Sequence, residues 1–202
     1  MPELPESQTI RTIHNRRSIR QFQDRPVDQE LIQTLLDCAN QAPSAHNQQP
    51  WRFIVIQGAK KAELQALVSK RAQDFHKPVS TILRMAARTI ASAPVVIAVM
   101  NTGQIIANGA RLFRVQPEQG LDFFRTMEIQ SSAAAVQNLL LAAASLGLGS
   151  VWLGILYVIK EELLHFLQEP EGEFMAVIPI GYPHKSSQGP RKKSLQNVVK
   201  HL

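Results

Sequence analysis

Pro94-Val95-Val96-Ile97-Ala98-Val99-Met100 is the stretch of sequence that decides the fold. It is short and apolar at every position, so both of its faces need burial, as in a strand covered on each side. Residues 51–56 and 174–182 also have strand composition, and proline or glycine bounds each of them. These three segments predict a small mixed or antiparallel sheet.

Longer segments with helical periodicity separate the strands. Strands interleaved with helices predict an α+β fold, and 202 residues with 45% apolar content fit one domain spanning 1–202. One helix should begin after Asp28 as N-cap and end before Pro43. The other expected helices cover residues 4–15, 59–75, 78–91, 127–146 and 160–167.

Two segments fit neither pattern. Residues 101–125 have no clean period, which predicts a cap or lid over a pocket. Residues 150–154 should form a short strand or a turn.

The basic residues lie in two short segments near the chain ends, and the net charge is +6. This distribution favours one anion held from two sides over a nucleic-acid track, and no aromatic ladder for base stacking accompanies it. The N-terminus shows no signal-peptide pattern, and the single cysteine, Cys38, fits a core position in a reducing, cytoplasmic setting. The uncharged stretch 129–159 is interrupted by Gly147 and Gly149, so we expect a buried helix, not a membrane span.

Several kinds of catalytic site are missing from the sequence. The six histidines are scattered without metal-ligand spacing, and no nucleophile elbow, Walker loop or complete dinucleotide fingerprint occurs. We therefore expect no metal, and no protein side chain acting as the catalytic centre.

The segment Arg16-Arg17-Ser18-Ile19-Arg20 is the strongest candidate for anion binding, because the planar guanidinium fork matches phosphate oxygens. Three further motifs follow it along the chain. They are Pro43-Ser44-Ala45-His46-Asn47-Gln48-Gln49-Pro50-Trp51, Gly147-Leu148-Gly149-Ser150-Val151-Trp152-Leu153-Gly154 and Pro190-Arg191-Lys192-Lys193.

In this order and spacing, the four motifs resemble the FMN-dependent nitroreductase family. The resemblance runs from about Arg16 to Val198. It implies a three-layer sandwich with helices on both sides of the sheet and an extended C-terminal arm. It also implies a homodimer with shared FMN sites, in which NAD(P)H reduces FMN at N5 and FMN then reduces a nitroaromatic or quinone by a ping-pong mechanism.

The resemblance also assigns roles to individual residues. Arg16 and Ser18 match positions that contact the phosphate and ribityl groups, Arg17 adds to that binding, and Arg20 matches the basic residue beside the flavin pyrimidine. In the arm, Arg191 and Lys193 are our choice among three cations for completing the phosphate site.

Two other motifs match parts of the family's flavin site. Pro43, Ser44 and Asn47 match a loop that reaches the flavin held mainly by the other subunit. Trp152, Leu153 and Gly154 match a strand whose backbone lies along the flavin, with the Gly154 N–H as donor to N5. Close packing between subunits is expected from small and apolar residues of the long helix, namely Ala133, Ala134, Leu139, Leu140 and Ala143.

Other interpretations stay open. Arg17 can be a surface charge, Ser44 and Asn47 can cap a turn, Gly154 can serve a tight turn, and Trp152 can be core. The protein can also be a specialised family member that destroys flavin, dehalogenates or oxidises azolines, or a non-catalytic flavin-binding regulator. Residues 101–125 match no subgroup signature and should shape substrate choice.

Overall fold

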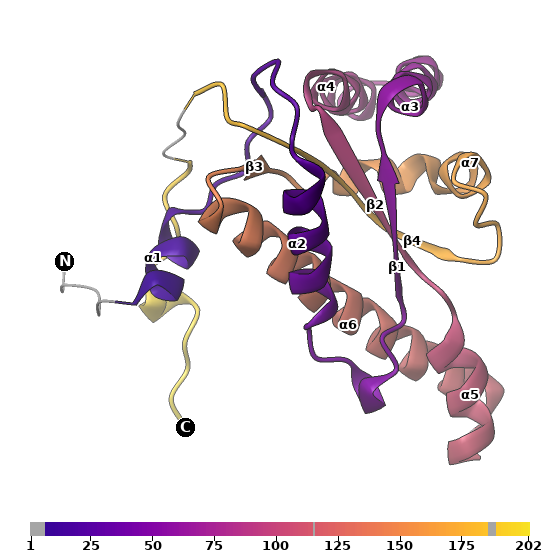
Figure 1. Ribbon diagram of the computed structural model, residues 1–202. Coiled ribbons are helices and arrows are strands. Elements are labelled where there is room, and N and C mark those ends of the chain that lie inside the picture. Colours follow the sequence, from indigo (N-terminus) through magenta and orange to yellow (C-terminus); the bar gives the residue numbers. More distant parts are fainter. Residues whose placement is uncertain (1–6, 115, 186–188) are drawn as a thin grey trace.

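The computed structural model describes residues 7–114, 116–185 and 189–202. Its sheet has the strand order β1-β2-β4-β3 (Figure 1). The strands are Trp51–Ile56 (β1), Val95–Asn101 (β2), Gly149–Ser150 (β3) and Glu173–Gly181 (β4). All three ladders are antiparallel. The α+β class and the three main strands predicted from composition are confirmed.

Strand β2 has buried side chains on both faces, as its sequence predicts. Val96, Ala98 and Met100 face one hydrophobic cluster, which helices α3 (Gly58–Arg71), α4 (Val79–Ser92) and α7 (Lys160–Phe166) help to form. Val95, Ile97 and Val99 face a second cluster with α2 (Gln29–Asn40) and α6 (Pro117–Ser145). The sheet is therefore the middle of three layers (Figure 1).

The predicted helices are found, with some changes at their ends. The first helix, α1, covers Gln8–Asn15, and the first part of its predicted range lies outside the described residues. Asp28 occupies the N-cap position of α2 but makes no side-chain capping bond. Helix α3 ends at Arg71 and continues as a short 3-10 turn, η2 (Ala72–Asp74).

The structure corrects one part of the prediction for residues 101–125. Where the sequence shows no clean period, the chain forms helix α5 (Gln104–Phe113) and the first turns of α6. The long helix thus begins at Pro117, not at Met127, with proline in its first turn, where a missing N–H costs nothing. No helix of the described chain is both long and apolar enough to span a membrane.

One expectation about the surface of α6 is wrong. Leu139, Leu140 and Ala143 are buried in the chain's own core against β2 and β4, so they are not available for contact with a second subunit. Ala133 and Ala134 are only half-buried and remain accessible. The inward side of α6 is needed by the sheet, which the uncharged sequence alone does not reveal.

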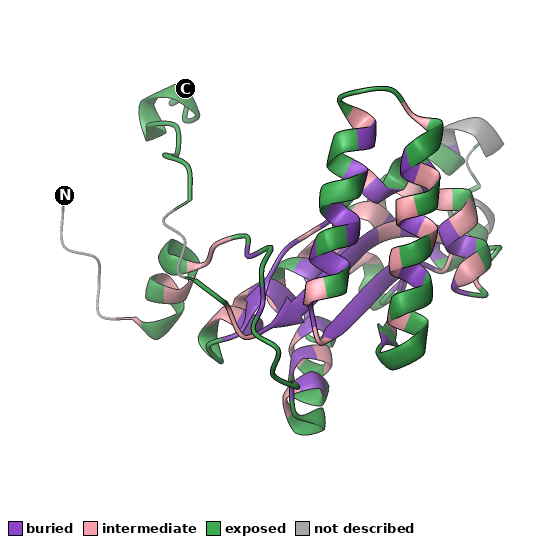
Figure 2. Cartoon of the chain, turned by 90° about the horizontal axis from the view of Figure 1, so that it is seen from above, coloured by how far each residue is buried: buried purple, intermediate pink, exposed green. Residues whose placement is uncertain are grey.

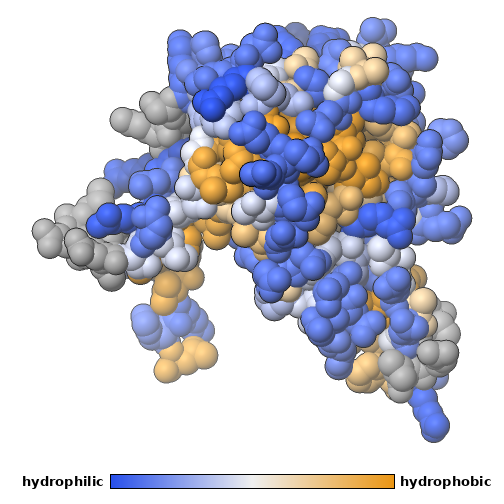
Figure 3. All heavy atoms as spheres, in the orientation of Figure 1, coloured by the Kyte–Doolittle hydropathy of each residue, from blue (hydrophilic) through white to orange (hydrophobic). Residues whose placement is uncertain are grey.

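Helix α1 and the C-terminal arm lie on the same side of the molecule, at the edge away from α3 and α4 (Figure 1). Helix α1 has no buried residue, and the arm that starts at Gly189 is exposed along its length (Figure 2). The arm includes one short 3-10 turn, η4 (Leu195–Asn197). Its apolar side chains are visible beyond the body of the molecule (Figure 3). Four of them are strongly exposed, namely Leu195, Val198, Val199 and Leu202.

Candidate functional site

A cavity of about 640 Å³ joins the two ends of the chain. We call it the cationic cavity, because, among the described residues that line it, five side chains are basic and none is acidic. From the N-terminal part come Ile13, His14, Arg16, Arg17, Ser18 and Arg20, from α6 comes Gln137, and from the arm come Gly189, Pro190 and Lys192. All four residues predicted from the first basic motif are thus brought together with part of the arm.

The end of α1 fixes the start of the basic motif. The Arg16 N–H donates to the Thr12 carbonyl and closes the helix. Arg17 Nη1 donates to the carbonyl oxygens of His14, at 2.5 Å, and Arg16, at 2.9 Å. A cation at the C-terminal carbonyls is favourable for a helix. Arg17 therefore lines the cavity and also holds the helix end, a role that neither sequence-based interpretation included.

Next, the chain runs beside the start of the third motif. Ser18 forms a parallel bridge with Ser150, and the Ile19 N–H donates to the Ser150 carbonyl at 3.0 Å. Ile19 is buried while Ser18 and Arg20 are both exposed, as alternation in an extended segment requires. This alternation directs Ser18 and Arg20 to the cavity side.

The arm approaches Arg17 closely at Gly189. This glycine has φ +67°, and a Cβ there would lie 2.7 Å from Arg17 Cδ, so only glycine fits without a shift. Lys192 then lines the cationic cavity, whereas the predicted Arg191 and Lys193 do not line it, although all three side chains are exposed. The choice of Arg191 and Lys193 as the phosphate contacts stays a prediction, and the cavity lining makes Lys192 the competing candidate.

Trp152, Leu153 and Gly154 follow β3 and lead into η3 (Gly154–Ile159). Leu153 is buried, and its N–H donates to the Val177 carbonyl of β4 at 3.0 Å. Gly154 is exposed, and the nearest side-chain atoms to a Cβ placed there belong to Trp152, at 3.8 Å. The Gly154 backbone is therefore open to a flat ligand.

The Pro43–Pro50 loop lies elsewhere, and none of its residues lines the cationic cavity. The Ala45 N–H donates to the hydroxyl of Ser131 in α6, at 3.2 Å. Ser44 Oγ accepts the Gln49 N–H at 3.0 Å, and Asn47 Oδ1 accepts a bond from the Gln49 side chain at 3.2 Å. Both predicted donors thus stabilise the loop through their oxygens, which leaves the Ser44 O–H and the Asn47 NH₂ as donors.

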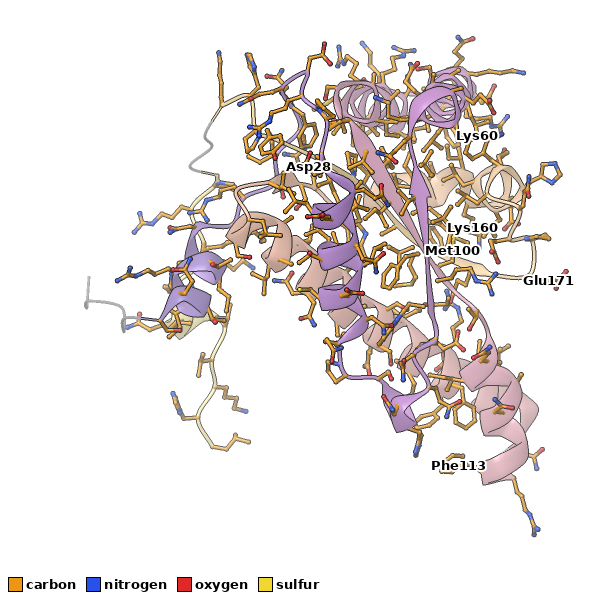
Figure 4. All side chains as sticks on the ribbon, in the orientation of Figure 1. Asp28, Lys60, Met100, Phe113, Lys160 and Glu171 are labelled. Atoms are coloured by element: carbon orange, nitrogen blue, oxygen red, sulfur yellow. The ribbon has the colours of Figure 1, made fainter. Side chains whose placement is uncertain are left out.

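A second cavity, of about 320 Å³, lies beside this loop. We call it the aromatic pocket; it is lined by His46, Gln48, Ile105, Asn108, Gly109, Phe113 and Phe124. The Phe113 ring lies 5.5 Å from the His46 ring and 5.7 Å from the Phe124 ring. Phe113 stands at the far end of α5 (Figure 4). Sequence reasoning assigned the region a pocket but none of these side chains.

The residues present fit FMN. The cationic cavity offers guanidinium and ammonium groups for a phosphate, and its volume is within the range of small-molecule sites. The exposed Gly154 backbone lies four residues after Ser150, the residue of β3 whose carbonyl accepts the Ile19 N–H. In the described part of the chain, no three His, Cys, Asp or Glu side chains gather as a metal site would require.

Comparison with known proteins agrees with this arrangement. The model of the Nitroreductase family matches residues 13–182. A protein of Archaeoglobus fulgidus, provisionally named NADH dehydrogenase/NAD(P)H nitroreductase, is 32% identical over 86% of this chain and 84% of its own. The 5,6-dimethylbenzimidazole synthase of Rhodospirillum rubrum is 28% identical over 89% of this chain and 84% of its own.

Among solved structures, a provisionally named nitroreductase of Desulfovibrio desulfuricans in complex with FMN has a TM-score of 0.73 and 28% identity. The similarity covers 99% of this chain and 98% of that protein. The chain therefore belongs to the nitroreductase family. The family and the three-layer fold that the four motifs implied are both confirmed.

Proposed function

We propose that the protein is an FMN-dependent oxidoreductase that takes electrons from NAD(P)H and passes them to a small acceptor, such as a nitroaromatic or a quinone. The observation that carries this proposal is the cationic cavity, built from both ends of the chain. Such a site suits one terminal phosphate, as in FMN, and the sequence offers no dinucleotide-binding motif.

The sequence-based enzyme class, an NAD(P)H-dependent flavin oxidoreductase, is confirmed by family membership, and FMN as cofactor agrees with the complex of the related structure. When bound, FMN supplies the two-electron chemistry. The chain's own contribution is to bind, orient and tune the cofactor.

Roles for individual residues follow from their places. Arg16, Ser18 and Lys192 are proposed to hold the phosphate, because they line the cavity where the two chain ends meet. Arg20 is proposed to stand by the flavin pyrimidine, where positive charge favours the reduced form. The Gly154 N–H is proposed as the donor to N5, since its backbone is exposed.

A homodimer with shared sites is part of the proposal. Within one chain, Ser44 and Asn47 lie apart from the cationic cavity. Their loop contacts α6 at Ser131, whereas the cavity contacts α6 at Gln137. These two positions are six residues apart, which corresponds to about 9 Å along the helix axis. A second subunit can bring its own loop to the cofactor.

The surface of the chain supports the same assembly. The arm exposes 75% of Leu195 and 60% of Val198, which a lone chain would leave in water. A groove of about 340 Å³ between α1, α2 and α6 contains Leu141 and Ala142 and offers a further apolar surface. We expect a dimer in sedimentation at micromolar concentration, and a monomer with full FMN affinity would contradict the shared site.

The aromatic pocket is proposed to select the acceptor. It is walled by α5 and the start of α6, the region whose sequence matched no subgroup. We propose that NAD(P)H and the acceptor use the active site in turn, as a ping-pong mechanism requires.

We further propose that residues 1–202 form one domain, since both cores share one sheet, and that the protein works in the cytoplasm.

The test is to identify the cofactor and measure turnover. Purified protein should release FMN on denaturation, identified by mass, and should oxidise NADH or NADPH with a nitroaromatic or quinone, giving parallel double-reciprocal plots. Recovery of FAD alone, or failure to bind any flavin on reconstitution, would refute the cofactor assignment. FMN binding without turnover would favour the regulator, the rival from another functional class.

A specialised family member is the second candidate function. The relative named 5,6-dimethylbenzimidazole synthase favours it, at 28% identity over most of both chains. Incubation of FMN-loaded protein with NAD(P)H in air separates the two candidates. Intact FMN after many turnovers supports the general reductase, and loss of FMN in step with NAD(P)H oxidation supports a flavin-destroying enzyme.

A further inference from the structure

Glu128 is a carboxylate in α6 with no exposed surface. Its Oε1 accepts the N–H groups of Ile105, at 2.7 Å, and Ile106, at 3.4 Å, and its Oε2 accepts the Gly103 N–H at 3.2 Å. A buried carboxylate is costly unless hydrogen bonds replace its water. These three bonds supply that compensation, and all of them come from the beginning of α5.

Helix α5 has no cap of its own. Its N-cap residue is Gly103, with φ +76°, which brings no side chain to the free N–H groups. Glu128 takes the place of the missing cap from a position 25 residues away in sequence. A negative charge at a helix N-terminus also interacts favourably with the helix dipole. The placement of α5 against α6 therefore depends on this carboxylate.

The charged neighbours of Glu128 are already paired with each other. Glu173 of β4 accepts bonds from Arg125 Nε, at 2.6 Å, and from the Asn101 amide, at 3.2 Å. Asn101 in turn accepts a bond from Ser132. Arg125 is thus bound to Glu173, and the three hydrogen bonds of Glu128 described above all come from backbone N–H groups at the start of α5.

Helix α5 carries one wall of the aromatic pocket. Ile105, Asn108, Gly109 and Phe113 line the pocket from α5, opposite Phe124 of α6. The contact is close, because a Cβ at Gly109 would lie 2.4 Å from the Phe124 ring. Phe124 is four residues before Glu128, so one turn of α6 carries both the ring that faces α5 across the pocket and the carboxylate that caps α5.

We propose that Glu128 is a positioning residue for acceptor choice: it fixes the first turn of α5 and so sets the distance between the two walls of the aromatic pocket. The capping role stands on the hydrogen bonds alone, whereas the link to the acceptor rests on the proposed function. A loosened α5 should change the pocket's width, and thus which acceptors fit, without moving the cationic cavity.

The experiment uses FMN-loaded Glu128→Gln and Glu128→Ala proteins, with Glu162→Gln as the matched control. Glu162 is a half-buried carboxylate of α7 that pairs with Arg71, away from α5. Hydrogen exchange over residues 103–109 reports on the cap. We expect roughly tenfold faster exchange or more in Glu128→Ala, the scale for lost bonds to a charged group, and a smaller change in Glu128→Gln.

The second readout is the ratio of kcat/KM for two acceptors of different size, nitrobenzene and 2-methyl-1,4-naphthoquinone. We expect Glu128→Ala to change this ratio at least about threefold, mainly through KM, and Glu128→Gln to restore part of the wild-type ratio. If the protein proves not to reduce these compounds, calorimetric affinities for the same pair, measured on all variants, replace the kinetic ratio.

The possible results distinguish the capping role of Glu128 from its role in acceptor choice. Unchanged exchange over residues 103–109 in Glu128→Ala would overturn the capping role, and the Gln variant decides the matter if the Ala variant does not fold. Faster exchange with an unchanged acceptor ratio would leave Glu128 a structural cap and overturn its role in acceptor choice. Absence of flavin or of turnover would count against the proposed function alone.

Discussion

The Ile19 amide donates a 3.0 Å hydrogen bond to the Ser150 carbonyl oxygen. This bond joins the first basic motif to the segment that leads to Gly154, although 131 residues separate the two partners in sequence. In the proposed function, the segment that contains Ile19 holds the phosphate, and the segment that follows Ser150 lies along the flavin ring. The contact therefore fixes the distance between the two ends of the cofactor site.

Gly149→Ala should disturb this contact. A Cβ at residue 149 would lie 2.8 Å from Ile19 Cβ, and both residues are buried, so the two segments must move apart. We expect a loss of roughly 1–3 kcal/mol in the free energy of unfolding and weaker FMN binding. Urea unfolding and fluorescence titration with FMN measure the two effects.

Gly147→Ala is the control for this prediction. Gly147 has φ +74°, and a Cβ added there would meet no atom within 4 Å, so its replacement strains the backbone without a clash. It should lower stability but leave FMN affinity near that of the wild type. Equal FMN affinity in both variants would show that the Ile19–Ser150 contact does not set the site.

The two cavity arginines should differ in effect. Arg16→Ala should weaken FMN binding by roughly 1.5–3 kcal/mol, the scale of a hydrogen bond to a charged group, with activity restored at saturating FMN. Arg20→Ala should instead lower the flavin reduction potential and slow reduction by NAD(P)H, even at saturation, because it removes positive charge beside the pyrimidine. Titrations and potentiometry separate the two. An Arg20→Ala protein with wild-type potential and rate would make Arg20 a phosphate ligand like Arg16.

The arm provides a test of register. All three cations of the arm are exposed, but Lys192 lines the cationic cavity, whereas Arg191 and Lys193 do not. Lys192→Ala should therefore reduce FMN affinity about tenfold, and Arg191→Ala, which removes the same charge one residue earlier, should have a much smaller effect. Both affinities should be measured at two salt concentrations. A larger loss of FMN affinity in Arg191→Ala than in Lys192→Ala would support the expectation that Arg191 and Lys193 are the phosphate contacts.

Sequence patterns predicted the α+β class and most of the helices and strands, because these depend on local composition, whereas the three-layer arrangement was implied by the family resemblance. The apolar run around Ile97 could only be a strand buried on both faces, and the helices around it follow from their period. That the basic motif and the arm contribute to one phosphate site could be predicted only from the family resemblance. Their meeting at Gly189 and Arg17 is a long-range contact that no local pattern encodes.

The region 101–125 could not be predicted for the same reason. The N-cap residue of α5 is a glycine, and the group that caps the helix, Glu128, belongs to another helix. Nothing within the helix's own stretch of sequence therefore indicates where it starts. Likewise, the aromatic pocket is formed by His46, Phe113 and Phe124 from three different elements, so its composition emerges only once the chain is folded.

The pH dependence of stability offers a test of the buried carboxylate. Burial raises the pKa of Glu128 above its ordinary value of 4.5, and the three N–H donors oppose this shift only in part. The folded chain thus keeps this proton to a higher pH than the unfolded chain does. The free energy of unfolding should therefore fall as pH rises from about 4.5 through the raised pKa, and this contribution should then level off. Urea unfolding between pH 4 and 8 measures the slope, which Glu128→Gln should remove and Glu162→Gln should leave in place. A difference between wild type and Glu128→Gln that is constant with pH would mean that Glu128 keeps its ordinary pKa, with its charge fully compensated by the amides of α5.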